Sequence, residues 1–520
     1  MMLTTDKKSC TILTDILAAH GIRHVVMSPG SRNMPLMVAA HRDRRLTTTM
    51  VVDERVNGFM ALGMAVATNR PVAIICTSGT ALLNFAPAVA EAYYRHVPLI
   101  VVSADRPAAW IDQDDSQTMR QPGALTNITK LTVDISEPRS SEDIWRTNRQ
   151  INDAILMATG GCKGPVHINI QLNEPLNGLT DITAGTERII HRATTETIIS
   201  AEMISRMAYT LANAPRVMVI AGFMQADDEV NQALVRLSHR PNTVVLTENI
   251  SNQHSADFVE CVDLGIREVT EINDSDMQPD IVITMGGALV SRFVKNYLRR
   301  YHPQHHWHVG VTRTTVDCMQ SLSERVDTDA RTFLKQILDV DTVVTESSYA
   351  EKWRNIKKAS IERRNNIIAR SPWTELKVFA QLLPCIPAHY DLHLSNGTPI
   401  RYAQLLADTT HAAHTWCNRG VSGIDGSTST AIGSCMTSGK PTLLITGDTS
   451  AQYDMGALAV RDIPANFRMV VIDNSGGGIF RFIGSTRHLE ERELLFGDPV
   501  NFQAKQLAKA YGFSYLEATN

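Results

Sequence analysis

Residues 442–480 read TLLITGDTSAQYDMGALAVRDIPANFRMVVIDNSGGGIF. Leu443–Thr446 and Met469–Ile472 are short, almost wholly apolar runs, and each leads into a polar turn that contains glycine. Such runs are typical of strands that are buried on both faces of a parallel sheet. Twenty-five residues separate Asp448 from Asn474, which is about one strand–helix–strand crossover. We therefore predict that both side chains lie at the carboxyl ends of neighbouring parallel strands, where such sheets bind ligands.

The polar groups that follow these two strands suit a divalent metal ion bound to a diphosphate. Mg²⁺ prefers oxygen ligands and often takes several of them from phosphate and water. Asp448 offers a carboxylate oxygen, Asn474 an amide oxygen and Gly476 a backbone carbonyl. Ordinary turn chemistry explains either motif alone, but the two motifs at crossover spacing favour a metal site. The residues expected to face the diphosphate, at a tight turn and a helix start, are Gly447, Thr449 and Ser450.

Length, charge and cysteine usage narrow the class of protein. The 520 residues exceed what one hydrophobic core usually supports, so we expect two or three domains. The net charge of −4 argues against a nucleic-acid or anionic-membrane binder, because both need clustered positive charge. The eight cysteines are scattered without a CxxC pair, which favours reduced thiols. The first residues lack the apolar core of a signal peptide, and no apolar run approaches the ~20 residues of a membrane span. We expect a cytoplasmic protein.

The order of strand-like and helix-like segments predicts an α/β protein with three doubly wound parallel-sheet domains. We expect these domains at residues 1–180, 195–345 and 355–520, with a linker rich in Gly, Thr, Asn and Asp at Asn173–Arg192. The chain ends at Asn520, about where a last helix and strand are expected, so the third domain looks short at its C-terminus.

Apolar runs and helical periodicity locate the elements of these domains. In the first domain helices are expected at residues 11–20, Met34–His41 and Glu54–Thr68, and strands at His24–Met27, Thr48–Val52, Pro71–Thr77, Pro98–Ser103 and Val166–Ile170. In the second domain strands are expected at Arg216–Gly222, Thr243–Thr247 and Asp280–Gly287, and in the third a helix-like stretch extends through Tyr453–Val460.

The spacing of Asp448 and Asn474 resembles the metal-binding motif of thiamine-diphosphate enzymes. The resemblance implies thiamine diphosphate as cofactor, together with Mg²⁺ or Mn²⁺. Such an enzyme needs a desolvated carboxylic acid to activate the aminopyrimidine of the cofactor. Glu54 is the candidate catalytic residue, because it follows the strand at Thr48–Val52 and begins a helix. An ordinary first-turn glutamate, which the helix dipole favours, is the alternative interpretation.

The resemblance extends to the glycine-rich loop Gly420–Gly426. In thiamine-diphosphate enzymes a large apolar residue at this place holds the cofactor in its bent shape, which implies that role for Ile424. An ordinary loop with one core isoleucine explains the same letters. By the same resemblance Ser422, Gly423 and Ile479 are assigned to cofactor binding.

Eight stretches of the two outer domains resemble a single family. They are SPGSR (28–32), DER (53–55), CTSGT (76–80), SADRP (103–107), RQPG (120–123), NRGVSGIDG (418–426), GDTSAQYDM (447–455) and NSGGGIF (474–480). These stretches are similar to the 2-succinyl-5-enolpyruvyl-6-hydroxy-3-cyclohexene-1-carboxylate synthases of menaquinone biosynthesis. The resemblance implies a transferase that decarboxylates 2-oxoglutarate and adds the succinyl unit to isochorismate, with a first domain that binds the pyrimidine and a third that binds diphosphate and metal.

Arginines fit substrates that carry several carboxylates, because a guanidinium binds a carboxylate with two hydrogen bonds. The resemblance implies that Arg401 and Arg419 hold the distal carboxylate of the 2-oxoglutarate unit, and that Phe480 forms an apolar wall. Each arginine alone is as well explained by a surface or helix-capping role. The residues implied for isochorismate are Ser31, Arg32, Arg106, Gln117 and Arg292.

Two positions depart from the family pattern. The family commonly has Lys where Arg292 stands and Ser where Gly397 stands, which alters the geometry offered to the substrate. In this superfamily the first domain of one subunit faces the third domain of another, so the resemblance implies a homodimer or homotetramer with active sites between subunits.

Other classes of function remain open from the residues alone. An acetohydroxyacid synthase or similar carboligase explains Glu54, Asp448 and Asn474, but it has no need of several arginines for a small neutral acceptor. A non-catalytic ligand-binding protein has no need of Glu54. A nicotinamide dehydrogenase is disfavoured, because no G-x-G-x-x-G motif follows the first strand.

Overall fold

The computed structural model describes residues 2–497 and 502–519. The chain forms two compact units. The first unit combines the chain up to Ala193 with Asn418–Glu517, and the second comprises Thr194–Cys417. The first unit therefore unites the amino-terminal sheet with the segment that follows residue 417.

A six-stranded sheet with strand order β3-β2-β4-β5-β7-β6 forms the amino-terminal part of the first unit. All neighbouring pairs are parallel. The chain order reverses between β2 and β4, and ligands of such sheets bind at this switch point, outside the carboxyl ends of the strands. The strands are β2 (His24–Met27), β3 (Thr47–Met50), β4 (Val72–Cys76), β5 (Leu99–Asp105), β6 (Thr132–Ile135) and β7 (Val166–Gln171).

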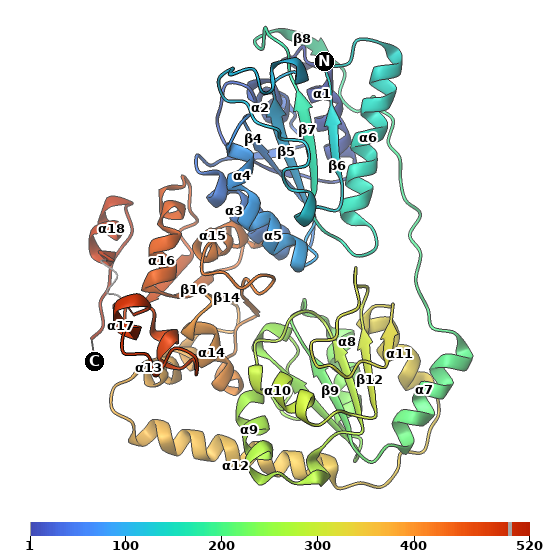
Figure 1. The fold of residues 1–520 in the computed structure, drawn as a ribbon, viewed down its shortest axis with the longest axis vertical. Helices are drawn as coiled ribbons and strands as arrows, with labels where there is room; N and C mark the ends of the chain where they lie inside the picture. Colours follow the sequence, from blue (N-terminus) through green and yellow to red (C-terminus); the bar gives the residue numbers. More distant parts are fainter. Residues whose placement is uncertain (1, 498–501, 520) are drawn as a thin grey trace. The chain divides into compact units, whose positions relative to one another are not determined.

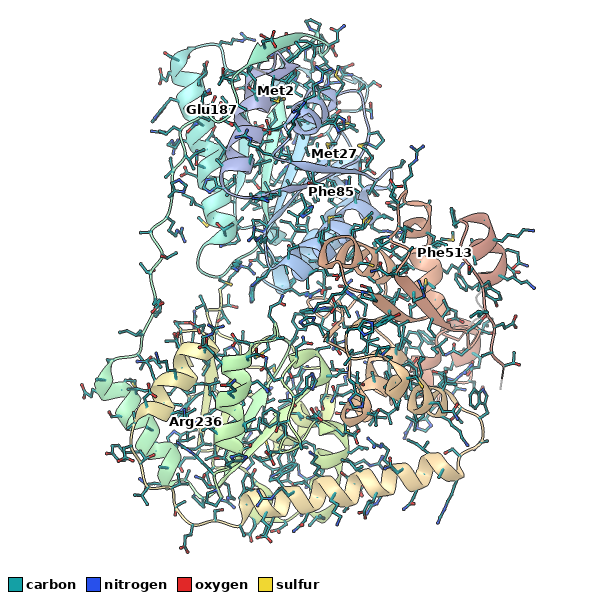
Figure 2. All side chains as sticks on the ribbon, turned by 180° about the vertical axis from the view of Figure 1, so that it is seen from behind. Met2, Met27, Phe85, Glu187, Arg236 and Phe513 are labelled. Atoms are coloured by element: carbon teal, nitrogen blue, oxygen red, sulfur yellow. The ribbon has the colours of Figure 1, made fainter. Side chains whose placement is uncertain are left out.

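Helices cover both faces of this sheet (Figure 1). One face packs on α1 (Lys8–Ala19), α2 (Met34–Arg42) and α6 (Ser141–Thr159), whose apolar side chains share one core with the strands. The other face packs on α3 (Glu54–Thr68). The short helix α4 (Ala81–Asn84) and α5 (Ala86–Tyr94) follow β4. Phe85, labelled in Figure 2, is fully buried at the start of α5 and lies beside Gly58 of α3.

The carboxyl-terminal part of the first unit contains a parallel pair of strands, β16 (Thr442–Gly447) and β17 (Phe467–Ile472). Helix α15 (Ser427–Ser438) precedes β16, and α16 (Asp448–Tyr453) follows it directly, with a 3-10 turn at Met455–Ala459. The carboxyl-terminal part also contains α17 (Arg492–Leu495) and α18 (Ala504–Ala510). Further 3-10 turns of the first unit lie at Ala108–Trp110, Thr126–Ile128 and Gly478–Arg481.

Helices α3 and α15 cross with their backbones in contact. A Cβ atom placed on Gly63 would lie 2.0 Å from the carbonyl oxygen of Thr430. A Cβ atom placed on Gly433 would lie 2.0 Å from the carbonyl oxygen of Met60. Only glycine fits at both positions, because real Cβ atoms do not approach backbone atoms so closely. The helix that begins with Glu54 is thus held against the helix that precedes β16.

The second unit contains a five-stranded parallel sheet with strand order β10-β9-β11-β12-β13. Its strands are β9 (Val217–Ala221), β10 (Thr243–Thr247), β11 (Ile281–Met285), β12 (His305–Val309) and β13 (Glu324–Val326). Successive residues of each strand point to opposite faces of the sheet, and the two faces pack into two separate hydrophobic cores. One core is closed by α7 (Ala201–Asn213), α8 (Asp228–Ser238) and α11 (Ala330–Asp339), and the other by α9 (Val262–Ile272), α10 (Arg292–Arg300) and α12 (Tyr349–Arg370).

The long helix α12 leads from this sheet to the last elements of the second unit (Figure 1). Strands β14 and β15 form a parallel pair. These last elements are α13 (Glu375–Leu382), β14 (Asp391–Leu394), α14 (Thr398–Leu405) and β15 (His414–Trp416); short 3-10 turns lie at Asn249–Ser251, Ser275–Met277, Leu383–Cys385 and Ala407–Thr409.

The expected α/β class with parallel sheets is confirmed, and several details differ. Asn173–Arg192 is not only a linker, because Leu179–Ile182 (β8) pairs antiparallel with Met2–Thr5 (β1). The helix-like stretch through Tyr453–Val460 ends at Tyr453 and continues as a 3-10 turn. Residues 173–192 lack the alternating apolar pattern that is typical of a strand, so the sequence did not predict β8. The strand is identified by its pairing with β1. Among the described residues no helix is long and apolar enough to span a bilayer.

Candidate active site

Glu54 is the first residue of α3 and lies just past the end of β3. Asp53 caps the helix, with its carboxylate accepting hydrogen bonds from the backbone N–H groups of Arg55 and Val56. Glu54 is half-buried, and this burial raises its pKa, with the neighbouring Asp53 charge acting in the same direction. Burial raises the pKa of the Cys76 thiol at the end of β4, and the Glu54 charge acts in the same direction. Burial therefore favours the protonated form of Glu54 more than that of an ordinary surface glutamate.

Asp448, the first residue of α16, is buried and tied to the loop after β17. Its Oδ2 accepts a hydrogen bond of 2.9 Å from the Gly476 N–H, and its Oδ1 accepts one of 2.6 Å from the Thr449 N–H. Burial raises the pKa of Asp448, and these hydrogen bonds oppose the rise. Asn474 stands two residues before Gly476, and its Oδ1 atom is buried. Carboxylate, amide and carbonyl oxygens are thus gathered at the ends of β16 and β17, a donor set that suits Mg²⁺.

The loop from Asn418 to Gly426 contacts both α16 and α3. The Ile424 carbonyl accepts a hydrogen bond of 2.6 Å from the Ser450 hydroxyl of α16. A Cβ on Gly426 would lie 2.2 Å from the Phe59 ring of α3, so only glycine allows this helix to approach the loop. Ile424 is 37 % exposed, which leaves its side chain available to a ligand.

Two further contacts join α3 to the segment after β16. The Arg55 guanidinium donates a hydrogen bond to the Tyr453 carbonyl and stacks over the Tyr453 ring at 4.9 Å. The Asp53 carboxylate lies 3.4 Å from a Cβ placed on Gly456. Glu54, the loop with Ile424 and the Asp448 segment therefore belong to one packed assembly inside the first unit of a single chain.

A buried carboxylate holds the start of α15, just after this loop. Asp454, fully buried, accepts hydrogen bonds of 2.7 Å from both the N–H and the hydroxyl of Ser429. Burial raises the pKa of Asp454 to about 6. Asp454 was not among the predicted site residues, although it lies within the quoted stretch GDTSAQYDM. Only its partner, 25 residues earlier in the chain, reveals what it does.

Arg32 and Arg106 lie in loops after β2 and β5. Arg32 is 5 % exposed; its guanidinium donates to the Leu172 carbonyl and pairs with Glu174, each at 3.0 Å. Arg106 donates its backbone N–H to Asp105 and pairs through its guanidinium with Asp115 at 2.8 Å. Burial raises the pKa of Asp105 to about 6, and the Arg32 charge opposes the rise. Both guanidinium groups thus have acidic partners, which a carboxylate substrate would have to displace or share.

A buried polar network that the sequence did not predict supports these loops. Gln121 accepts a hydrogen bond of 2.6 Å from the Gly79 N–H and donates to Asn169 at 2.8 Å. Asn169 in turn donates to Asp105 and accepts from the Ser103 hydroxyl. Both Asp105 and Gln121 lie within stretches quoted for the family, but these stretches alone assign them no partner.

The other predicted residues of the first unit occupy loops and short turns. Gln117 has a positive φ of 55° and lies with its backbone beside Gly79, where a Cβ would be 3.4 Å from the Gln117 carbonyl. Ser31 is exposed after β2, and Arg419 is half-buried at the start of the Gly420 loop. The Phe480 ring packs against Phe496 with centroids 5.2 Å apart, and Ile479 precedes it in a 3-10 turn.

Arg292 and Arg401 belong to the second unit, as does Asp263. Arg292 is the exposed first residue of α10, and the hydroxyl of its cap Ser291 accepts a hydrogen bond of 3.1 Å from the Val294 N–H. Burial raises the pKa of Asp263, while Ser291 and the Arg401 charge oppose the rise. Glu248, also buried, accepts hydrogen bonds from the N–H groups of Val290 and Ser291 at 2.7 Å. The start of α10 is therefore held firmly, and it presents Arg292 to solvent.

The fold and this site define a thiamine pyrophosphate enzyme. Residues 8–124 match the N-terminal TPP binding domain of thiamine pyrophosphate enzymes, and residues 189–394 match a thiamine pyrophosphate middle domain. Relatives that match almost the whole of this chain are named 2-succinyl-5-enolpyruvyl-6-hydroxy-3-cyclohexene-1-carboxylate synthase. The relative from Porphyromonas gingivalis is 38% identical over 99% of this chain and 90% of its own. Those from Flavobacterium psychrophilum and Bacteroides thetaiotaomicron are each 38% identical, over 98% and 99% of this chain and 90% and 91% of their own. The chain belongs to this synthase family, which confirms the resemblance seen in its motifs.

Proposed function

We propose that this protein decarboxylates 2-oxoglutarate with thiamine diphosphate and transfers the succinyl unit to isochorismate, as a step of menaquinone biosynthesis. The reaction follows from the family to which the chain belongs. The observation that carries the proposal is the oxygen-rich turn at Asp448, together with a half-buried Glu54 whose pKa is raised by burial. In the proposed assembly, Glu54 of one subunit and Asp448 of another would serve one cofactor.

The residues of the first unit fit the cofactor and its metal ion. The buried oxygens of Asp448 and Asn474, with the Gly476 backbone, are the hard ligands that Mg²⁺ or Mn²⁺ would take beside a diphosphate. Thiamine diphosphate, when bound, supplies the electron sink that lets a 2-oxo acid lose carbon dioxide. The residues that would hold the cofactor are Ser422, Gly423, Ile424, Gly447, Thr449, Ser450 and Ile479.

Glu54 would hold and deliver the proton that activates the cofactor. Burial raises its pKa and so favours the protonated form, whose side-chain oxygen can donate a hydrogen bond to a ring nitrogen. Because Asp53 caps the helix, Glu54 is not needed for that structural role and its carboxyl is available for chemistry.

The arginines would neutralise and orient the two anionic substrates. We propose that Arg401 and Arg419 bind the distal carboxylate of 2-oxoglutarate, because a guanidinium offers two hydrogen bonds to such a group. Phe480 would cover the apolar part of the substrates. The proposed isochorismate residues are Ser31, Arg32, Arg106, Gln117 and Arg292. Positioning two anions beside the reacting centre is the main contribution of these groups to the rate.

The assembly and location belong to the same proposal. Val52, Val421 and Tyr453 expose apolar side chains around the site, and exposed apolar surface of this kind often marks a protein interface. We propose a homodimer or homotetramer with active sites between subunits, which light scattering at micromolar concentration would test. We further propose that the protein acts in the cytoplasm, where small anionic metabolites are dissolved.

One experiment tests the reaction directly. Purified protein is incubated with thiamine diphosphate, Mg²⁺ and 2-oxoglutarate, with and without isochorismate, and the products are followed by mass spectrometry. We expect the succinyl adduct only when both substrates are present. Isochorismate consumed only with pyruvate, or with neither 2-oxo acid, would contradict the proposal.

A further inference from the structure

A buried glutamate on α5 holds the loop that carries Arg419. Glu91 is 2 % exposed, and its two carboxylate oxygens accept hydrogen bonds from two consecutive backbone N–H groups. Oε1 accepts from Gly420 and Oε2 from Val421, each at 2.7 Å. Charge-assisted hydrogen bonds of this length are stronger than neutral ones, and burial prevents water from replacing them.

Glycine at position 420 lets the loop reach this carboxylate. A Cβ on Gly420 would lie 2.6 Å from the Glu91 carbonyl oxygen and 3.0 Å from Cγ of Arg95. The loop backbone therefore lies directly against α5, and no other residue type fits there without a shift of the helix or the loop. Two independent observations therefore fix the contact between the loop and α5: glycine is required at position 420, and Glu91 accepts two backbone hydrogen bonds.

Arg95, which caps the C-terminal end of α5, completes the arrangement. It lies one turn after Glu91, with Nε 3.9 Å from Oε1, and both side chains are almost fully buried. Arg95 also donates a hydrogen bond of 3.1 Å to Oδ1 of Asn418, whose amide donates to the Thr430 hydroxyl of α15. The buried charge of Glu91 is thus compensated by Arg95 and two N–H groups, as buried charges require.

The loop between Asn418 and Ile424 is consequently pinned at both ends. Asn418, Gly420 and Val421 are held from α5, and the Ile424 carbonyl is held by Ser450 of α16. Between these points Ser422 adopts a positive φ of 69°, which a residue with a side chain adopts only when its surroundings require it. Arg419 lies between two pinned residues, so the course of its backbone is fixed from α5.

We propose that Glu91 is a positioning residue that, together with Arg95, sets the direction of Arg419 and hence the binding of the 2-oxo acid. This inference rests on the proposed function, in which Arg419 meets the distal carboxylate of 2-oxoglutarate. Glu91 itself touches no substrate in this scheme. Its loss should therefore weaken binding of the donor acid much more than binding of isochorismate.

Glu91→Gln tests the proposal with little change in volume. Glutamine can accept only one of the two N–H groups through oxygen, and its amide N–H then faces the other N–H. We expect KM for 2-oxoglutarate to rise about tenfold, the scale of one lost charge-assisted hydrogen bond, while KM for isochorismate stays within about twofold. Arg95→Lys, which keeps the charge but not the fork geometry, should give a smaller change in the same direction. Glu142→Gln, at an exposed position of α6, is the matched control and should leave both values unchanged.

Limited proteolysis gives a readout that needs no activity. Trypsin cleaves after arginine, and the Arg419–Gly420 bond lies in the pinned loop. We expect Glu91→Gln to be cut at this bond several times faster than the wild type and Glu142→Gln, with the site identified by fragment mass, because a released loop opens more often. The melting temperature is measured in parallel to separate loop release from general unfolding.

The outcomes separate the two proposals. Unchanged cleavage at Arg419 together with unchanged KM for 2-oxoglutarate would overturn the role of Glu91. An equal rise of both KM values with a lowered melting temperature would overturn it too, because Glu91 would then only stabilise the unit. A wild-type protein that converts no 2-oxoglutarate and isochorismate would instead refute the proposed function, and the cleavage at Arg419 would still report on the loop.

Discussion

The backbone N–H of Gly476 donates a hydrogen bond of 2.9 Å to Oδ2 of Asp448. This bond joins the turns after β16 and β17, so the expected metal ligands are held together by the protein itself. The Asp448 carboxylate also accepts from the Thr449 N–H. A metal ion would therefore meet a carboxylate that is already oriented, rather than one that must be ordered on binding.

Asp448→Asn should weaken metal binding. The substitution keeps the size of the side chain but removes the negative charge and one of the two acceptor oxygens. We expect the affinity for Mg²⁺ in the presence of thiamine diphosphate to fall by at least about tenfold, as measured by isothermal titration calorimetry. Asp462→Asn, at an exposed turn with a positive φ that asparagine tolerates, is the control. Equal Mg²⁺ affinity in all three proteins would exclude Asp448 as a ligand.

Glu54→Gln should nearly abolish turnover while the fold is kept. A glutamine cannot transfer a proton, and general acid–base residues contribute about 10²- to 10⁴-fold to enzymatic rates. We expect kcat to fall by that order, with the melting temperature within a few degrees of the wild type. Glu202→Gln is the matched control, because Glu202 is also a first-turn glutamate, on α7, and is exposed. If both variants turned over like the wild type, Glu54 would be only a first-turn residue.

Gly63→Ala and Gly433→Ala should each destabilise the first unit. The added methyl would meet a backbone carbonyl oxygen at 2.0 Å, and a helix backbone cannot rotate away as a side chain can. Overpacking of this kind costs about 1–3 kcal/mol or more, and urea denaturation would measure it. Gly484→Ala is the control, because no atom lies within 4 Å of its added Cβ. A loss of stability no larger than in the control would show that α3 and α15 pack less closely.

The pKa of Asp454 makes part of the stability depend on pH. Burial raises this pKa to about 6. The folded protein therefore keeps the proton of Asp454 up to about that pH, whereas the unfolded chain releases it at a lower pH. The contribution of Asp454 to stability is full below its ordinary pKa, is lost as pH rises through about 6 and stays constant above that. The difference in unfolding free energy between the wild type and Asp454→Asn should therefore decrease from pH 5 to pH 7, by about 1 kcal/mol. A difference that is flat over this range, in chemical denaturation, would show that Asp454 titrates normally.

Buried parallel strands were the part of the fold most open to prediction. Continuous apolar runs gave β2 (His24–Met27) and β10 (Thr243–Thr247) with the bounds they have in the structure. Strand β6 (Thr132–Ile135) was missed, because it lies at the sheet edge and has an exposed aspartate in its middle. Strand β8 was missed for a different reason, since among the described residues it pairs with β1 alone, far away in the sequence.

The candidate site was predictable where one residue type in a short motif carries the chemistry. Glu54 and Asp448 follow strands, so their places on the sheet edge follow from local pattern. Glu91 and Asp454 could not be found in this way, because their function lies in the partner they hold. Glu91 meets Gly420 across 329 residues of sequence, and no local period encodes such a contact.

The glycine-to-glycine crossing of α3 and α15 also limits how segments of this protein can be exchanged with those of relatives. Each helix presents its bare backbone to the other, so a partner helix from another relative with any larger residue at the crossing would be rejected. Hybrid proteins should therefore fold only when both helices come from one parent or both parents carry glycine there. Since α3 begins with Glu54 and α15 leads into the strand before Asp448, the segments that carry Glu54 and Asp448 must be inherited together in every subunit.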